Sequence, residues 1–184
     1  MKRLIHQLRS QVTGFLPDAL RREDGTATME FVLVVPLIIA IFMASFEGGL
    51  LMIRSILLEQ SVDMTMRELR LGHYPAATNH LLKKEICKRT IIFADCVSNM
   101  KIELQRVSTT AWDMPAAPVK CINRVQNIDP VVTMTGLQND LMLIRVCVVQ
   151  DAMFPTTGIG LELPLDSGGG YGLVARSAFV VEPS

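Results

Sequence analysis

One acidic residue, Glu30, stands immediately before a long apolar run in this chain of 184 residues. The run from Phe31 to Phe46 carries no charged side chain, and Gly25 lies five residues before the glutamate. An ionised group inside a bilayer costs roughly 2.5–3.5 kcal/mol even on insertion scales, so an acid beside a membrane segment is a candidate for function. The chemistry that suits it is ion pairing with a cationic partner in a medium of low dielectric.

Four cysteines form the second group of reactive side chains, and all of them follow the apolar run. An even number of cysteines on one side of a membrane segment fits disulfides in an oxidising compartment, which in a bacterium is the periplasm. Three pairings are possible. We favour Cys87 with Cys96, across a short loop, and Cys121 with Cys147, while four free buried thiols are the alternative.

Signals for catalysis or cofactor binding are lacking, and we expect neither an enzyme nor a metal protein. The histidines, His6, His73 and His80, are scattered, and the cysteines show no Cys-x-x-Cys spacing. The Ser-Gly-Gly-Gly run at 167–170 precedes an expected strand instead of a helix, so it does not predict a phosphate-binding loop. Acidic and basic residues balance at 18 each, which provides no basic field for nucleic acid.

The order of polar and apolar segments divides the chain into four parts. Residues 1–25 read as a polar leader, and residues 26–53 are long and apolar enough for a transmembrane helix. Residues 54–72 predict an amphipathic continuation of this helix, and residues 73–184 form a separate domain. One face of the continuation carries apolar residues at helical spacing: Leu58, Val62, Met66 and Leu69.

The charges that flank the apolar segment predict its orientation. Two arginines adjoin its start, and the first basic residue after it is Arg54. The positive-inside rule therefore places the leader in the cytoplasm and the domain in the periplasm. Within the span Glu47 is the only charge besides Glu30, and we expect it near the outer interface. The basic residues before the span are Lys2, Arg3, Arg9, Arg21 and Arg22.

The remaining pattern predicts an α+β fold, because helical segments come first and strands follow. The strands should form a small antiparallel sheet packed on the long amino-terminal helix. We expect a second helix over 78–93 and strands over 97–108, 141–149 and 171–181. Residues 109–140 and 151–170 should be irregular, with a short strand near Val131 in the first of these segments.

The stretch from Arg21 to Pro36 resembles the opening of TadE-like proteins of the Tad (tight adherence, Flp) pilus system. Those proteins carry arginines, a patch of small residues, Glu-Phe and a Leu/Val/Pro-rich run; here Glu30-Phe31 is followed by Val-Leu-Val-Val-Pro. Later segments add to the resemblance: the cysteine-bounded stretch 87–96 leading into a strand, Arg-Val at 145–146 before a Pro-containing loop, and a closing Glu-Pro at 182–183.

The resemblance implies a minor pilin or pseudopilin with a pseudopilin-like fold and a role in assembly of the Tad/Flp pilus. A prepilin peptidase would cut between Gly25 and Thr26, so that Glu30 becomes the fifth residue of the mature chain. Glu30 and Phe31 would then act in assembly, with Glu30 paired to the free amino terminus of a neighbouring subunit. The implied partners are the prepilin peptidase, other Tad minor pilins, the major Flp pilin, the Tad secretion apparatus and the lipid bilayer of the bacterial inner membrane.

Other readings of the same residues remain open. The chain could be an unprocessed single-span inner-membrane protein whose periplasmic domain binds a partner as a scaffold, with Glu30 an incidental acid among lipid headgroups. A secretory signal peptide is less suitable, because Ala-Ser-Phe-Glu at 44–47 offers no clean small-x-small cleavage site. The amino-terminal residue of the mature protein separates the first two readings: Thr26 for the pilin, Met1 or Lys2 for the scaffold.

Overall fold

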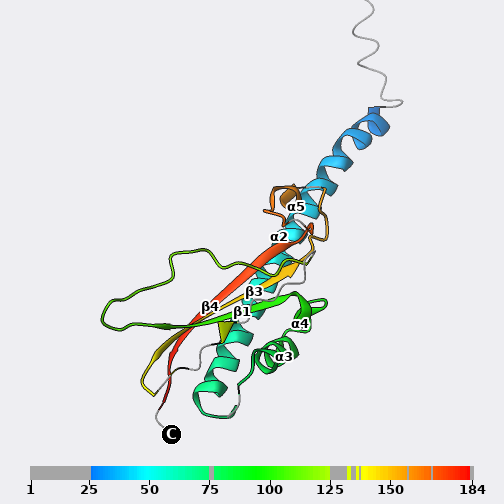
Figure 1. Cartoon of the computed structure of the whole chain (residues 1–184). Coiled ribbons are helices and arrows are strands. Elements are labelled where there is room, and N and C mark those ends of the chain that lie inside the picture. Colours follow the sequence, from blue (N-terminus) through cyan, green and yellow to red (C-terminus); the bar gives the residue numbers. More distant parts are fainter. Residues whose placement is uncertain are drawn as a thin grey trace, which may run out of the picture. The chain divides into compact units, whose positions relative to one another are not determined.

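The structure is a computed structural model that describes residues 26–74, 77–124, 132–133, 136, 138–156, 158–166 and 168–182. The elements in chain order are α2 (Thr26–Arg70), α3 (Asn79–Arg89), α4 (Cys96–Asn99), β1 (Met100–Val107), β2 (Val132–Thr133), β3 (Leu141–Gln150), α5 (Gly158–Glu162) and β4 (Tyr171–Val180) (Figure 1). Contacts divide the chain into two units, Met1–Met43 and Ala44–Ser184. The leader expected over residues 1–25 lies outside the described residues.

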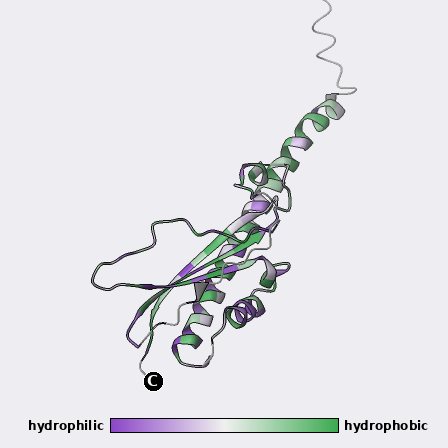
Figure 2. Ribbon diagram, in the orientation of Figure 1, coloured by the Kyte–Doolittle hydropathy of each residue, from purple (hydrophilic) through white to green (hydrophobic). Residues whose placement is uncertain are grey.

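Helix α2 contains Pro36 and belongs to both units. Its first part consists mainly of hydrophobic residues (Figure 2). Their side chains are exposed, with Leu33 at 73% and Phe42 at 70%. In its last turns the predicted apolar face is confirmed, because Leu58, Val62 and Met66 are buried and Leu69 packs beside them.

The carboxyl end of α2 is closed by its own backbone. The N–H groups of Leu71, Gly72 and His73 donate to carbonyls of the last helical turn. Gly72 has a φ of +75°, a left-handed conformation that glycine adopts without the steric penalty of a side chain. The helix therefore stops close to the boundary at residue 72 that the sequence predicts.

The sheet has the strand order β2-β1-β3-β4. Strand β3 pairs antiparallel with both β1 and β4, which confirms the predicted arrangement of the three long strands. The two-residue strand β2, however, pairs parallel with β1, so the complete sheet is mixed. A parallel return needs a long crossover, and the segment between β1 and β2 has the length for it.

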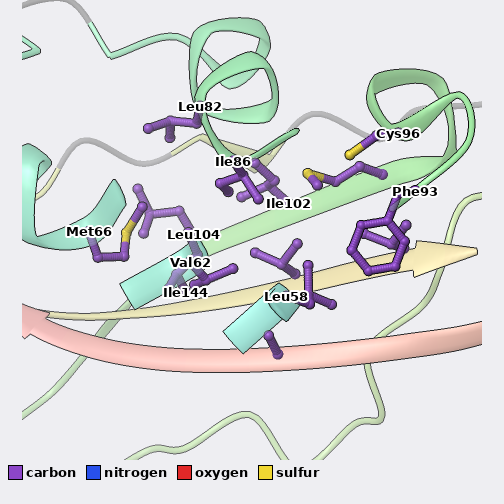
Figure 3. Close-up of a cluster of buried hydrophobic side chains, with 14 of the residues drawn as sticks. Leu58, Val62, Met66, Leu82, Ile86, Phe93, Cys96, Ile102, Leu104 and Ile144 are labelled. Carbon is purple, nitrogen blue, oxygen red and sulfur yellow. The ribbon is translucent and has the colours of Figure 1, made fainter. Parts of the chain in front are cut away.

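The hydrophobic core lies between one face of the sheet and the helices α2 and α3. Alternate residues of β1 and β3 point to this face, as the period of two in a strand requires. Figure 3 shows the cluster, whose labelled members are Leu58, Val62, Met66, Leu82, Ile86, Phe93, Cys96, Ile102, Leu104 and Ile144.

The region between α3 and β1 differs from the prediction. Helix α3 begins after Thr78, whose hydroxyl accepts a hydrogen bond from the N–H of Leu81. It ends at Arg89 instead of residue 93, and residues 96–99 form the short helix α4 where a strand was expected. The disulfide described below holds this turn, a constraint that a strand-like residue pattern does not reveal.

A polar cluster fastens the end of α2 to α3. Glu68 on α2 accepts hydrogen bonds from the Tyr74 hydroxyl and from Nη2 of Arg89, the latter at 2.5 Å. The Tyr74 hydrogen bond, and after it that of Arg89, hold the pKa of Glu68 below its ordinary value. The cluster is solvent-accessible, so it positions the two helices more than it stabilises them.

Candidate functional site

The residues that the sequence predicts for processing and assembly lie at the start of α2. Gly25, expected before the cut, lies outside the described residues, and Thr26 is the first residue of the helix. Glu30 follows about one turn later and is exposed, as is Phe31 at 66%. Both side chains of α2 are therefore accessible to lipid or to another protein chain.

The surface around Glu30 is strongly apolar. Met29, Leu33 and Leu37 are exposed at 67%, 73% and 62%. Soluble proteins rarely expose a continuous apolar surface of this length, so it marks a membrane or protein interface. Within the described part of the chain, α2 is the one helix long and apolar enough to cross a membrane.

Glu47, the second acid of the apolar segment, is fully buried in the other unit. Its carboxylate accepts hydrogen bonds from the backbone N–H of Met153, at 3.2 and 3.0 Å, and of Phe154, at 3.0 Å. Hydrogen bonds to an ionised acceptor are among the strong ones, and they replace the water that the carboxylate loses. Glu47 therefore attaches the segment after β3 to α2.

The same segment is held by two arginines. Nη1 of Arg54 donates to the Asp151 carbonyl at 3.1 Å and to the Tyr171 hydroxyl. Nη2 of Arg124 donates to Oδ1 of Asp151 at 2.7 Å and to the Gly168 carbonyl at 3.0 Å. The hydrogen bond from Arg124 holds the pKa of Asp151 below its ordinary value. Both ends of the excursion between β3 and β4 are thus fixed by cations.

The cysteines are paired as the sequence favoured. Cys87 on α3 joins Cys96 at the start of α4, with the Cα atoms 5.7 Å apart. Cys121 joins Cys147 on β3, with the Cα atoms 5.3 Å apart. The second bond fixes the middle of the long excursion after β1 against strand β3. Gly172 permits this approach, because a Cβ there would lie 2.6 Å from Sγ of Cys121.

Comparison with protein families decides what kind of chain carries this helix. Residues 25–67 match the family model of the TadE-like proteins. This segment of the chain is similar to the TadE-like proteins. The match begins at Gly25 and contains Glu30, Phe31 and Glu47, and it associates the chain with the Tad pilus machinery. Searches of curated proteins and of solved structures gave no match.

The matched segment covers the exposed apolar part of α2 and nearly all of its packed part. It ends at residue 67, before α3 and the sheet begin.

The second face of the sheet, opposite the helices, carries a row of charged residues. Glu103 on β1 pairs with Lys101 at 2.9 Å and with Arg145 at 2.7 Å. Arg145 lies directly opposite Arg176 on β4. Three cations thus share this face with one carboxylate. The segment 114–118 runs above the row, and a cavity of about 470 Å³ lies between it and Leu143, Arg145 and Arg176.

Sequence reasoning identified some of these residues and missed others. Residue type and spacing drew attention to Glu30, whose role stays a prediction, and to the cysteine pairs that the structure contains. Sequence reasoning treated Glu47 only as a charge near the outer interface and assigned nothing to Arg54 or Arg124. The signal that could have drawn attention to Glu47 is a second acid within an apolar run, which requires a partner in the fold. The expectation that the protein is not an enzyme stays a prediction.

Proposed function

We propose that this protein is a TadE-like minor pilin or pseudopilin that acts in assembly of the Tad/Flp pilus after a prepilin peptidase removes residues 1–25. The observation that carries the proposal is the exposed apolar part of α2 with Glu30 near its start, within the segment that matches the family. A helix with such a surface suits both a bilayer and a bundle of similar helices.

Assembly would use the charge of Glu30. Cleavage after Gly25 creates a free amine on Thr26, and that amine of one subunit can pair with the Glu30 carboxylate of its neighbour. In the low dielectric of a helix bundle this attraction is much stronger than in water. A neighbour docked out of register leaves the carboxylate desolvated without a partner, which is costly, so the charge also selects the correct register.

The proposed location follows from charge and redox chemistry. Basic residues precede the membrane segment, and both disulfides lie in the domain that follows it. We infer a cytoplasmic amino terminus, a single span in the inner membrane and a periplasmic domain. The partners on this proposal are the prepilin peptidase, other Tad minor pilins, the major Flp pilin and the Tad secretion apparatus.

The variant Glu30→Gln tests the role in assembly, because it retains shape and polarity and removes the charge. We expect it to be cleaved and inserted normally, yet to co-purify poorly with other Tad pilins and to reduce the number of surface pili. Glu59→Gln is the matched control, since Glu59 is an exposed acid further along the same helix. Wild-type piliation in Glu30→Gln cells would contradict the proposed ion pair.

An unprocessed single-span scaffold is the second candidate function, and the edge of the sheet favours it. Strand β4 is an edge strand, and among the described residues its outer side pairs only through a bridge between Leu165 and Tyr171. A long edge strand with a single charge, Arg176, is suited to accept a strand from a partner. An intact leader on the protein from cells that contain the peptidase would favour this function.

A further inference from the structure

The excursion between β3 and β4, residues 151–170, contacts α2 at the end of the apolar run and just beyond it. A Cβ on Gly158 would lie 2.9 Å from Cβ of Ala44, and a Cβ on Gly48 would lie 3.1 Å from Cδ1 of Ile159. The rings of Phe46 and Phe154 meet edge to face with their centroids 6.1 Å apart. The excursion thus lies against α2 before Arg54, the first basic residue after the run.

These contacts lie at the depth where the span should leave the bilayer. About 20 apolar residues cross the hydrocarbon core, so a span that starts at Phe31 ends near Leu50. At about 1.5 Å per residue, Ala44 then lies roughly 9 Å inside that end. Residues of the excursion that contact Ala44 and Phe46 must therefore reach the lipid interface.

Several large side chains of this segment and of the facing part of α2 are apolar and exposed. We name them the apolar collar: Phe46 (45% exposed), Met153 (56%), Ile159 (39%), Leu161 (65%) and Leu165 (44%). Exposure of several large apolar side chains to water is unfavourable, so such a group marks an interaction surface.

Most of the acids near the collar have a partner within the chain. Glu47 is fully buried and hydrogen-bonded to backbone N–H groups, so it presents no charge to its surroundings. Asp151 and Asp166 both lie within 4 Å of Nη2 of Arg124. Glu162 is exposed next to Leu161 and can extend to a polar headgroup region. This distribution is typical of a surface in the membrane interface, with apolar groups inward and polar groups in reach of water.

We propose that the apolar collar is inserted into the outer-leaflet interface of the lipid bilayer, so that the domain is seated on the membrane and not merely tethered by α2. The occupant of this surface is lipid. The inference requires that α2 anchors the chain in a membrane, and it does not depend on a role in the pilus.

Quenching of tryptophan fluorescence by brominated phosphatidylcholine tests the proposal on the full-length protein in vesicles. Trp112 is the one tryptophan of the chain, so the variant Trp112→Phe has no tryptophan fluorescence of its own. In that background Leu161→Trp and Leu165→Trp place the probe in the collar. Phe42→Trp reports on the anchor, and Ile91→Trp is the matched control, because Ile91 is apolar and 95% exposed outside the collar.

We expect brominated lipid to lower the emission of Leu161→Trp and Leu165→Trp by about twofold, since interfacial segments insert about 5–10 Å into the headgroup and acyl boundary. Ile91→Trp should be nearly unaffected, and Phe42→Trp should be quenched most.

The outcomes separate the collar from the anchor. If Phe42→Trp is quenched and both collar variants behave like Ile91→Trp, the collar does not contact lipid and the proposal is overturned, as it would be if a protein partner covers this surface. If Phe42→Trp is not quenched either, membrane anchoring fails and the proposal fails with it. Formation of both disulfides in each variant verifies that the domain has folded.

Discussion

At the scale of single residues, the two acids of the apolar segment differ in how their charge is satisfied. Glu47 is buried and receives hydrogen bonds from two backbone N–H groups of its own chain. Glu30 is exposed on the helix. A buried carboxylate without hydrogen-bond donors is costly, and the fold supplies donors to Glu47. If Glu30 has a partner for its charge, we expect that partner to come from another molecule.

Replacement of Glu47 should release the excursion from α2. In Glu47→Gln an amide oxygen in the place of Oε2 can still accept from both backbone N–H groups. The amide NH2 in the place of Oε1, however, cannot accept from the N–H of Met153, which lies 3.2 Å from Oε1, and it is left buried against that donor without the ionic character of the wild-type hydrogen bonds. We expect a loss of about 1–3 kcal/mol in local stability, the usual cost of an unsatisfied buried polar group. Hydrogen exchange of the peptide containing Met153 and Phe154, measured on the full-length protein in detergent, should become faster.

Glu59→Gln again serves as the control, because it removes an exposed acid of α2 and should leave exchange at residues 153 and 154 unchanged. Equal exchange rates in Glu47→Gln and the wild type would show that the hydrogen bonds to Glu47 do not hold this segment.

The two acids also show what a sequence reveals about single residues. Glu30 could be proposed from the sequence because the pattern that singles it out consists of neighbours in sequence, namely Gly25, Phe31 and the apolar run. The role of Glu47 could not be predicted, because its donors lie 106 and 107 residues away. Backbone N–H groups also leave no trace in residue type.

At the scale of secondary-structure elements, those with a periodic residue pattern could be predicted from the sequence. Those that depend on tertiary contacts could not. The apolar face of α2 and the alternation in β1 follow from repeats of 3.6 and two, so both could be predicted. The helix α5 has only five residues and no periodic pattern, and it exists because it packs on α2 near Ala44 and Gly48. The parallel pairing of β2 depends on a long crossover, which residue patterns do not encode.

Two glycine substitutions distinguish a glycine that is needed for packing from one that is not. A Cβ on Gly160 would lie 2.1 Å from the backbone oxygen of Phe154, so Gly160→Ala must displace α5 or the preceding turn. Overpacking of this kind typically costs about 1–3 kcal/mol. Gly49 lies within α2 with nothing within 4 Å of its Cβ position, so Gly49→Ala should stabilise by about 0.5–1 kcal/mol.

Chemical denaturation of both variants and of the wild type in the same detergent measures the change in the free energy of unfolding for each substitution. A Gly160→Ala protein as stable as Gly49→Ala would mean that α5 is not packed as closely as described.

At the scale of the whole molecule, two disulfides cross-link the domain that follows the apolar segment. One closes a separation of 9 residues and the other a separation of 26. Both pairs could be predicted from the sequence, including the attachment of the central loop to the core strand through Cys121 and Cys147. The structure adds the close approach of Gly172 to the second disulfide.

Removal of each disulfide should destabilise the domain by about 2–4 kcal/mol, and the longer loop should cost about 1 kcal/mol more because its closure entropy is larger. The double variants Cys87→Ala/Cys96→Ala and Cys121→Ala/Cys147→Ala measure these losses separately by denaturation. Peptide mapping without reduction checks the pairing itself. Four alkylatable thiols in protein from the periplasmic side would contradict both the pairing and the proposed topology.

The proposed function of the whole chain rests on one chemical event, which is cleavage beside the membrane. A peptidase needs an extended backbone at the cut, and glycine has neither a side chain nor a narrow backbone preference to oppose this. The same cut creates the amine that Glu30 is proposed to bind, so processing and assembly are linked.

The most direct test is the amino-terminal residue of the protein isolated from cells that contain the prepilin peptidase. We predict Thr26 in the wild type, and an uncut chain in Gly25→Leu and in cells that lack the peptidase. A wild-type chain that begins at Met1 or Lys2 in the presence of the peptidase would contradict the account of this protein as a processed pilin.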